Sequence, residues 1–359
     1  MMADGTHIEW TEATWNPITG CSLASPGCTN CYAMQLAGTR LAHIPSRAGL
    51  THPSKAGPVW TGEVRFNEEF LTQPLRWKRP RMIFVCAHGD LFHESVPDEW
   101  IDRIFAVMAL CPQHTFQVLT KRSARMREYF RETTGWRSRI AELLNELKPS
   151  PLWNGNVYQG WQNLHGRPDG LPNVWLGVSI EDQQRAGERI PDLLATPAAV
   201  RWISAEPLLG PVNLRRLRIT PVDHTIVDAL EGYTIVRAFE RGQDRRKIDW
   251  VVVGGESGSK ARPMHPDWAR ALRDQCAAAG VPFFFKQWGE WELSLDRDRD
   301  DPDWRADYSN DYVDRGKSKW LNLAGGSGFH GERFVVMRKV GKKHAGRLLD
   351  GVEHNGMPG

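Results

Sequence analysis

The 359-residue chain lacks the features that mark membrane, secreted and strongly charged proteins. No stretch approaches the roughly 18 uninterrupted apolar residues of a membrane-spanning helix, so we expect no membrane association. The first residues contain neither a basic segment nor an apolar run, and we expect no secretory signal. A formal net charge of only +3 is too small for a dedicated non-specific nucleic-acid binder, so any such binding depends on local patches. These absences favour a cytoplasmic protein, in which thiols stay reduced.

Cysteine is scarce, with six residues in the chain, but its distribution is uneven. Cys21, Cys28 and Cys31 follow the spacing C-x6-C-x2-C, whereas the other three cysteines are scattered through apolar or helix-like stretches. Clustered cysteines in a reducing compartment are typical of metal ligands or redox groups rather than of a disulfide framework. The three clustered thiols are therefore predicted to bind one metal centre.

The number of ligands distinguishes two kinds of centre. A structural zinc site normally has four protein ligands, but the loop holds no fourth cysteine and the nearest histidine is His43. Three thiolates on a [4Fe–4S] cluster would leave one iron without a protein ligand and open to a small molecule. The sequence favours this open cluster, and a zinc site completed by a distant histidine or cysteine is the alternative.

Seven near-continuous apolar runs of strand length occur along the chain. Runs of this type indicate strands that are buried on both faces of a sheet. Helical periodicity separates them, most clearly in Pro97–Leu110 and Pro266–Ala279. The alternation predicts an α/β fold made of parallel βαβ units, closed into a partial or full (β/α) barrel. The expected strands lie within residues 8–18, 82–86, 115–119, 174–179, 200–204, 250–253 and 282–285.

The domain organisation follows from this pattern. Residues 1–290 are predicted to form a barrel-like core, with the cysteine loop near residues 20–33. Irregular stretches near residues 38–80 and 213–247 are predicted to be insertions. Residues 291–359 are predicted to form a C-terminal extension that packs on the core.

Polar or glycine-rich groups follow each expected strand. Because the carboxyl ends of barrel strands build the active site, these groups are predicted to surround one mouth. After the cysteine loop they comprise Gly89-Asp90, Lys121-Arg122, Ser179, Glu181, Glu206, Gly254-Gly255-Glu256 and Lys286-Gln287-Trp288.

These segments resemble a known family. The stretch IEWTEATWNPITGCSLASPGCTNCYA, with GDLFHE, LTKR, WLGVSIED, RWISAEPLLGP, WVVVGGESG, FFKQWGEW and KKHAGRLLDG, is similar to the three-Cys-motif family of phage and bacterial proteins. A C-x-x-C pair preceded by a third cysteine, after the first strand of a parallel barrel, also resembles the radical S-adenosylmethionine (SAM) superfamily. The first gap here is longer than in the commonest C-x3-C-x2-C spacing of that superfamily.

The radical SAM resemblance implies a barrel of that type and an enzyme of the lyase, transferase or oxidoreductase kind. It implies that the open iron binds SAM, which is reductively cleaved to give a 5′-deoxyadenosyl radical. It also implies an electron donor such as a flavodoxin or ferredoxin.

The radical SAM resemblance also implies cofactor contacts for residues at matching positions after the expected strands. The resemblance implies that Gly89 and Asp90 contact the SAM amino group and that Ser179 and Glu181 contact its ribose hydroxyls. A helix-capping role is the alternative for Asp90. Glu206 is expected to bind cofactor or substrate, or to pair with an arginine. The run Gly254, Gly255 and Glu256 allows a ligand close to the backbone.

The expected substrate is a nucleic acid or nucleotide, bound for modification or lesion repair. Together with His88 and His93, five side chains would give the mouth a cationic, aromatic character that suits phosphates and bases. These are Lys121, Arg122, Lys286, Gln287 and Trp288. The alternatives are a zinc-stabilised, non-catalytic nucleic-acid-binding protein and a radical SAM enzyme that acts on a peptide or small metabolite. The sequence assigns no catalytic residue.

Overall fold

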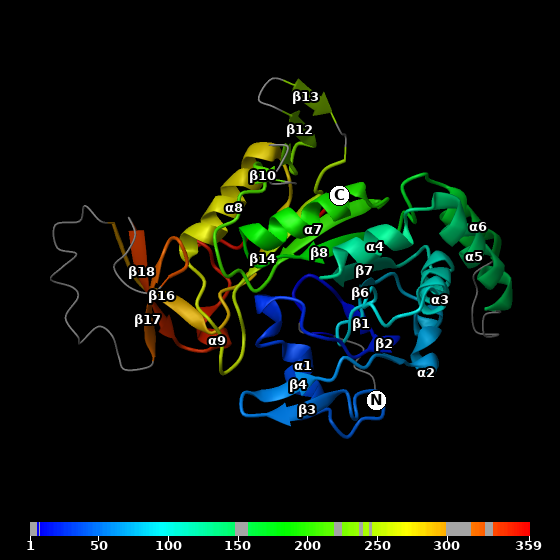
Figure 1. Ribbon diagram of the computed structural model, residues 1–359, viewed down its shortest axis with the longest axis horizontal. Coiled ribbons are helices and arrows are strands. Elements are labelled where there is room, and N and C mark those ends of the chain that lie inside the picture. Colours follow the sequence, from blue (N-terminus) through cyan, green and yellow to red (C-terminus); the bar gives the residue numbers. More distant parts are fainter. Residues whose placement is uncertain are drawn as a thin grey trace. The chain divides into compact units, whose positions relative to one another are not determined.

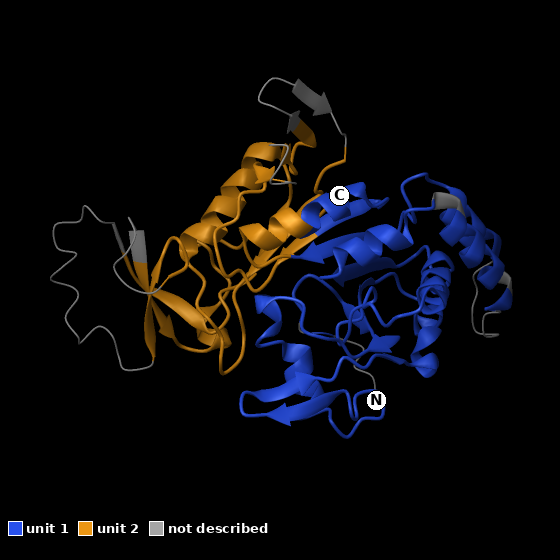
Figure 2. Ribbon diagram, in the orientation of Figure 1, with its two compact units in different colours: residues 1–179, 189–202 blue, residues 180–188, 203–359 orange. Residues whose placement is uncertain are grey.

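A computed structural model describes residues 6, 8–147, 157–218, 225–236, 240–243, 246–298, 317–326 and 333–359. The chain forms two compact units, which Figure 2 distinguishes by colour. Unit 1 comprises residues 1–179 and 189–202, and unit 2 comprises residues 180–188 and 203–359. The predicted division into residues 1–290 and 291–359 remains a prediction.

The main sheet has seven strands, and its strand order follows the order of the chain. The β1–β6, β6–β7, β7–β8 and β14–β15 pairs are parallel, with Ala13 opposite Ile83 and Val251 opposite Phe283. A doubly wound sheet would reverse its order at a switch point, whereas an order that never reverses fits a partial (β/α) barrel. The strands are β1 (Ala13–Trp15), β6 (Met82–Val85), β7 (Thr115–Thr120), β8 (Val174–Ser179), β9 (Val200–Ala205), β14 (Trp250–Gly254) and β15 (Phe283–Gln287).

These strands confirm the seven predicted apolar runs. The central residues of β6, β8, β9 and β14 are buried, as expected for strands covered on both faces. The first run divides at Asn16-Pro17, because proline has no N–H for the ladder. Its second part becomes β2 (Ile18–Thr19), which pairs with β5 (Arg65–Phe66) in an antiparallel arrangement.

Helices connect the strands, and the two predicted helices are confirmed as α3 (Asp98–Ala109) and α8 (Pro266–Ala279). In unit 1, α3, α5 and α6 pack against one another (Figure 1). Helix α8 ends at Gly280, whose φ of 64° is the left-handed conformation of a helix C-cap. The other helices are α1 (Tyr32–Ala37), α2 (Glu68–Leu71), α4 (Ser123–Tyr129), α5 (Thr133–Glu146), α6 (Val157–His165), α7 (Gln183–Ala195) and α9 (Lys342–Ala345).

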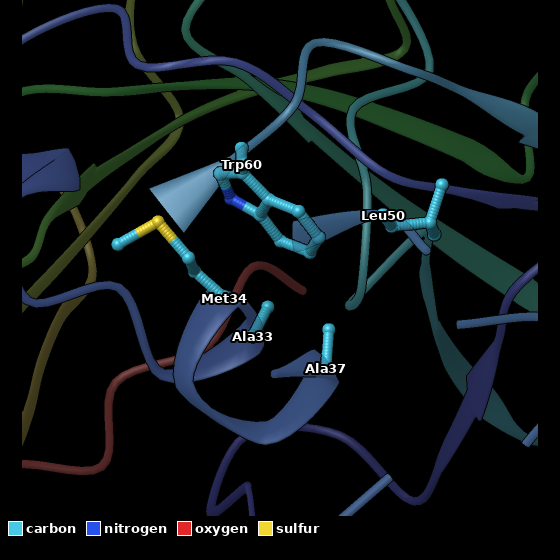
Figure 3. Packing of buried hydrophobic residues seen from close by; sticks show 5 residues of the cluster. All are labelled: Ala33, Met34, Ala37, Leu50 and Trp60. Atoms are coloured by element: carbon cyan, nitrogen blue, oxygen red, sulfur yellow. The ribbon is translucent and has the colours of Figure 1, made fainter. Parts of the chain in front are cut away.

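The predicted insertion at residues 38–80 contains a hairpin that supports the cysteine loop. Strands β3 (Thr51–Ser54) and β4 (Gly57–Trp60) form this hairpin, and α1 packs against β4. Figure 3 shows Ala33, Met34 and Ala37 of α1 facing Trp60 and Leu50, all of them buried. Cys21 and Cys31 pack against the same cluster. The cysteine loop therefore rests on a small apolar core of its own.

Two small antiparallel sheets belong to unit 2. The predicted insertion at residues 213–247 forms β10 (Leu217–Arg218), β11 (Ile226–Asp228), β12 (Tyr233–Val236) and β13 (Glu240–Gln243). Its residues 219–224, 237–239 and 244–245 lie outside the described residues. The second sheet has the order β16 (Trp291–Asp298), β18 (Arg333–Lys339) and β17 (Ser318–Asn322).

The chain end lies along β15, where Asn355 bridges Phe284 and Gly356 N–H donates to Phe283 O at 3.0 Å. Within the described residues, no helix is long and apolar enough to cross a membrane.

Candidate metal centre

The cysteine loop folds as two consecutive turns that bring its last two thiols close together. A short 3-10 helix spans Pro26–Cys28, and Cys28 N–H donates to Ser25 O at 2.9 Å. Cys31 N–H then donates to Cys28 O at 3.3 Å, and Cys31 O accepts from Gln35 N–H as α1 begins. The C-x2-C spacing thus corresponds to one turn of chain that leads into a helix.

A glycine fixes the other end of the loop. Gly20 has φ of 92°, and a Cβ there would lie 2.2 Å from Glu63 O, so only glycine fits. Gly20 N–H donates to His88 O at 3.1 Å, and Gly20 bridges Gly89 in parallel fashion. Cys21 is therefore held beside the segment that follows β6.

Each of the three sulfur atoms lies near N–H groups. Arg122 Nη1 donates to Cys21 Sγ at 3.4 Å, and Ala24 N–H donates to Cys28 Sγ at 3.5 Å. The backbone amides of Met34 and Ala33 lower the pKa of Cys31, although burial has the larger, opposite effect. N–H donors directed at sulfur stabilise a thiolate and tune an iron–sulfur cluster.

The Cys21 and Cys31 thiols are nevertheless protonated at neutral pH when no cation is bound, because their pKa values are raised. Burial raises the pKa of Cys21 to about 12; the Asp90 charge adds to this shift, and Arg122 opposes it. Burial likewise raises the pKa of Cys31, and the Cys28 thiol adds to the effect. These mutual influences place the three sulfurs within electrostatic range of one another. A metal centre would have to displace their protons.

Across the described part of the chain, no three His, Cys, Asp or Glu side chains converge closely enough to hold one metal ion. The three thiols thus lie near one another, but they do not converge on a point where a single metal ion would bind. Sulfurs that bind separate irons of one cluster stand farther apart than the ligands of a single ion. The soft donor set and its N–H partners fit a cluster bound by three thiolates.

Arg122 connects the cysteine loop to the ends of β6 and β7. Its guanidinium is buried and donates to Asp90 Oδ2 at 3.3 Å and to Cys21 Sγ. Nη2 donates to both Ser22 O and Ser22 Oγ at 2.8 Å, and Nε donates to Glu94 at 3.5 Å. The sequence predicted a substrate contact here, but the structure directs this side chain at the loop.

Asp90 is 5% exposed, and protein donors surround its carboxylate. Oδ1 accepts from Phe92 N–H at 3.0 Å and from Thr120 Oγ1 at 2.7 Å. Oδ2 accepts from Lys121 N–H at 3.2 Å and from Arg122. The bond from Phe92 N–H closes a local turn and caps no helix, because the next helix, α3, begins at Asp98. The contact with SAM remains a prediction.

His93, which the sequence placed at the predicted mouth, is a second support of the loop, a role that the sequence did not predict. Its Nδ1 accepts from Ser95 N–H at 3.1 Å, so the proton resides on Nε2. Nε2 then donates to Ser22 Oγ at 2.8 Å. His93 lies in the GDLFHE segment, and its position between Asp90 and Ser95 was the only feature of the sequence that indicated a role beside the loop.

Two further predicted residues meet in unit 1. Lys121 Nζ donates to Ser179 Oγ at 2.6 Å, which joins the ends of β7 and β8. Ser179 O accepts from Arg189 at 2.6 Å. This contact places an ammonium and a hydroxyl side by side at neighbouring strand ends, and their roles in binding remain predictions.

In unit 2, Glu206 and Lys286 form an ion pair at 3.2 Å. Ser204 Oγ also donates to Glu206, at 3.3 Å. A Cβ at Gly254 would lie 2.4 Å from Glu206 Oε1, so the glycine makes room for this carboxylate. The sequence expected an arginine as the possible partner of Glu206, and the structure shows a lysine.

The remaining predicted residues of unit 2 are buried or form hydrogen bonds with other residues of the protein. Arg262 donates to Glu256 through Nη2 at 2.6 Å and through Nε at 2.9 Å, which is a bidentate pair. Gln287 Nε2 donates to Ser257 Oγ at 2.9 Å. Three others are buried, namely Glu181, Gly255 and Trp288, and the Trp288 indole donates to Leu348 O.

Comparison with known proteins identifies the family but no activity. The chain matches the family described as "Protein of unknown function (DUF5131)" over residues 5–358, and it belongs to this family. No curated protein and no solved structure matches the chain.

Proposed function

We propose that this member of the DUF5131 family is a radical SAM enzyme that acts on a nucleic acid or nucleotide. Cys21, Cys28 and Cys31 would hold a [4Fe–4S] cluster, and the iron without a protein ligand would bind SAM. The cluster and SAM together would supply a 5′-deoxyadenosyl radical for hydrogen abstraction. The observation that carries the proposal is three clustered thiols, each near N–H donors, between the first two strands of a sheet whose order never reverses.

The protein's own groups support this chemistry by stabilising negative charge on sulfur. Arg122 places a buried cation 3.4 Å from Cys21 Sγ, which offsets the charge of a thiolate or of a reduced cluster. Arg122 and His93 both hold Ser22 and thereby fix the first turn of the loop. Trp60 and its neighbours pack against Cys21 and Cys31 and support the loop from one side.

Polar groups at other strand ends would bind the cofactor. We assign the SAM ribose to Ser179 of unit 1, while the sequence-predicted contacts of Glu181, Glu206 and Lys286 with SAM or substrate stay predictions. Lys121 would orient the Ser179 hydroxyl, because its ammonium donates to that oxygen at 2.6 Å.

Product analysis tests the proposal. Protein purified without oxygen and reduced with dithionite in the presence of SAM and a mixed oligonucleotide should release 5′-deoxyadenosine. The Cys28→Ser variant should release none, and Cys276→Ala, which alters a buried cysteine of α8, serves as the matched control. Iron-loaded protein that forms no 5′-deoxyadenosine would contradict radical chemistry. Protein that carries stoichiometric zinc and no iron would instead support the zinc-stabilised alternative.

A further inference from the structure

A second set of charged groups lies in unit 1, apart from the contacts already described. Arg40, Arg47 and His88, here called the cationic cluster, come from the segment after α1 and from the segment after β6. Arg40 is exposed, His88 is half-buried, and Arg47 is only 9% exposed. The cluster therefore extends from the surface into the protein.

Arg47 is a buried cation for which the described residues supply no compensating charge. Its Nη1 donates to Ser46 Oγ, while its Nε is buried with no hydrogen-bond partner. Burial alone lowers the pKa of Arg47, and no carboxylate among the described residues opposes this shift. A buried charge without a partner is costly, and an anionic ligand would offset that cost.

His88 presents a second incomplete group beside it. Its Nδ1 is buried with no hydrogen-bond partner. Burial lowers the pKa of His88 to about 4, and the charges of Arg47 and Arg40 contribute to this shift. The imidazole therefore lies within reach of both guanidinium charges, although no acidic group contributes.

The backbone places His88 next to the cysteine loop. His88 O accepts from Gly20 N–H, directly before Cys21, and His88 N–H donates to Asn16 Oδ1 at 3.0 Å. Tyr32, directly after Cys31, donates from its hydroxyl to Ala87 O at 2.6 Å. The Tyr32 ring is 51% exposed and lies edge-on to the His88 ring, with 6.2 Å between the centroids.

We propose that the cationic cluster is a binding site for a phosphate group of a nucleotide or nucleic acid, with the Tyr32 ring as a stacking surface for an adjacent base. Two guanidiniums and an imidazole supply several N–H donors of the kind that phosphate oxygens accept. An exposed aromatic ring beside them is the usual arrangement for a single-stranded nucleic acid. The choice of a nucleotide over another anion rests on the proposed function, whereas anion binding itself needs no metal centre.

Binding of a labelled single-stranded oligonucleotide, measured by fluorescence anisotropy, tests the site. Arg47→Gln should weaken binding roughly tenfold or more, as expected for the loss of charge-assisted hydrogen bonds. It should also reduce the salt slope by about one, the effect of losing one phosphate contact. Arg103→Gln, which removes a surface arginine paired with Glu68, is the matched control and should bind normally. Wild-type affinity and salt slope in Arg47→Gln would overturn the proposal.

Thermal unfolding separates a ligand site from a structural role. Because Arg47→Gln removes an unpaired buried charge, its melting temperature should equal or exceed that of the wild type. Inorganic phosphate should raise the melting temperature of the wild type more than that of the variant. The assignment would be overturned if Arg47→Gln melted at a lower temperature than the wild type and phosphate raised both melting temperatures by the same amount. Binding of a glutamate-rich peptide in preference to the oligonucleotide would also overturn it.

The failure of this site and the failure of the metal centre are distinguishable. Oligonucleotide binding by the Cys21→Ser, Cys28→Ser, Cys31→Ser triple variant should still depend on Arg47, whatever metal the wild type contains. Iron content should be unchanged in Arg47→Gln. A variant that loses iron and binding together would overturn the site, because Arg47 would then act through the cysteine loop.

Discussion

Arg122 shows how one side chain couples the cysteine loop to the sheet. Its guanidinium contacts Cys21 Sγ, the Asp90 carboxylate and both oxygens of Ser22. A cation at this distance from sulfur stabilises the more negative, reduced form of a bound cluster. In the proposed centre, Arg122 would therefore be a positioning residue with an electrostatic effect on the reduction potential.

Replacing Arg122 by methionine should make the midpoint potential of the cluster more negative. The expected shift is about 60 mV or more, which corresponds to a tenfold change in a one-electron equilibrium. A redox titration followed by electron paramagnetic resonance measures it. Arg125→Met, which removes a partly exposed arginine of α4 paired with Asp98, is the control. An unchanged potential in iron-loaded Arg122→Met would contradict this role.

At the scale of elements, one buried carboxylate joins three helices of unit 1. Asp102 of α3 accepts from the Tyr129 hydroxyl of α4 at 2.6 Å and from Arg139 Nε of α5 at 2.6 Å. Asp102 and Tyr129 are both buried, so the bond between them is protected from water. This cluster ties together the helices that follow β6 and β7.

The Tyr129→Phe variant should lower the free energy of unfolding by about 1.5–3 kcal/mol, the range for a hydrogen bond to a charged group. The loss is due to one oxygen, because the phenyl ring keeps its packing against Phe105 and Phe130. Urea denaturation measures the change. An unfolding free energy equal to that of the wild type would show that the bond contributes nothing net.

The same tyrosine gives a pH dependence. Burial and the Asp102 charge raise the pKa of Tyr129 well above its usual 10, so the folded state favours the neutral phenol. A group whose pKa is higher in the folded than in the unfolded state stabilises the fold fully at pH values below its unfolded-state pKa. This contribution is lost as the pH rises above the unfolded-state pKa towards the folded-state pKa. Stability should therefore decrease above about pH 10, and it should decrease less in Tyr129→Phe. Equal alkaline destabilisation of both proteins would contradict this origin.

The sequence predicted the helices and strands well, because a strand that is buried on both faces of a sheet is a continuous run of apolar residues. Runs such as Val251–Val253 and Phe283–Phe285 identified strands, and the periodicity of Pro266–Ala279 identified a helix. Side-chain direction was not predictable in the same way. The position of Arg122 after a strand suggested an open mouth, yet its buried path to Ser22 depends on contacts between residues 100 positions apart.

For the whole molecule, the central claim is that Cys21, Cys28 and Cys31 share one metal centre. The sequence spacing proposed this centre, and the fold adds N–H donors near each sulfur and an apolar support beneath the loop. The raised thiol pKa values mean that binding must release protons, so metal uptake should weaken as the pH falls.

The most direct measurement is the iron and sulfide content of protein prepared without oxygen. The wild type should carry about four of each per chain, as expected for one four-iron cluster. Cys21→Ser, Cys28→Ser and Cys31→Ser should each lose most of both, whereas Cys111→Ala and Cys276→Ala should retain them. A wild type without iron and sulfide, or single cysteine variants that keep full amounts of both, would contradict the account.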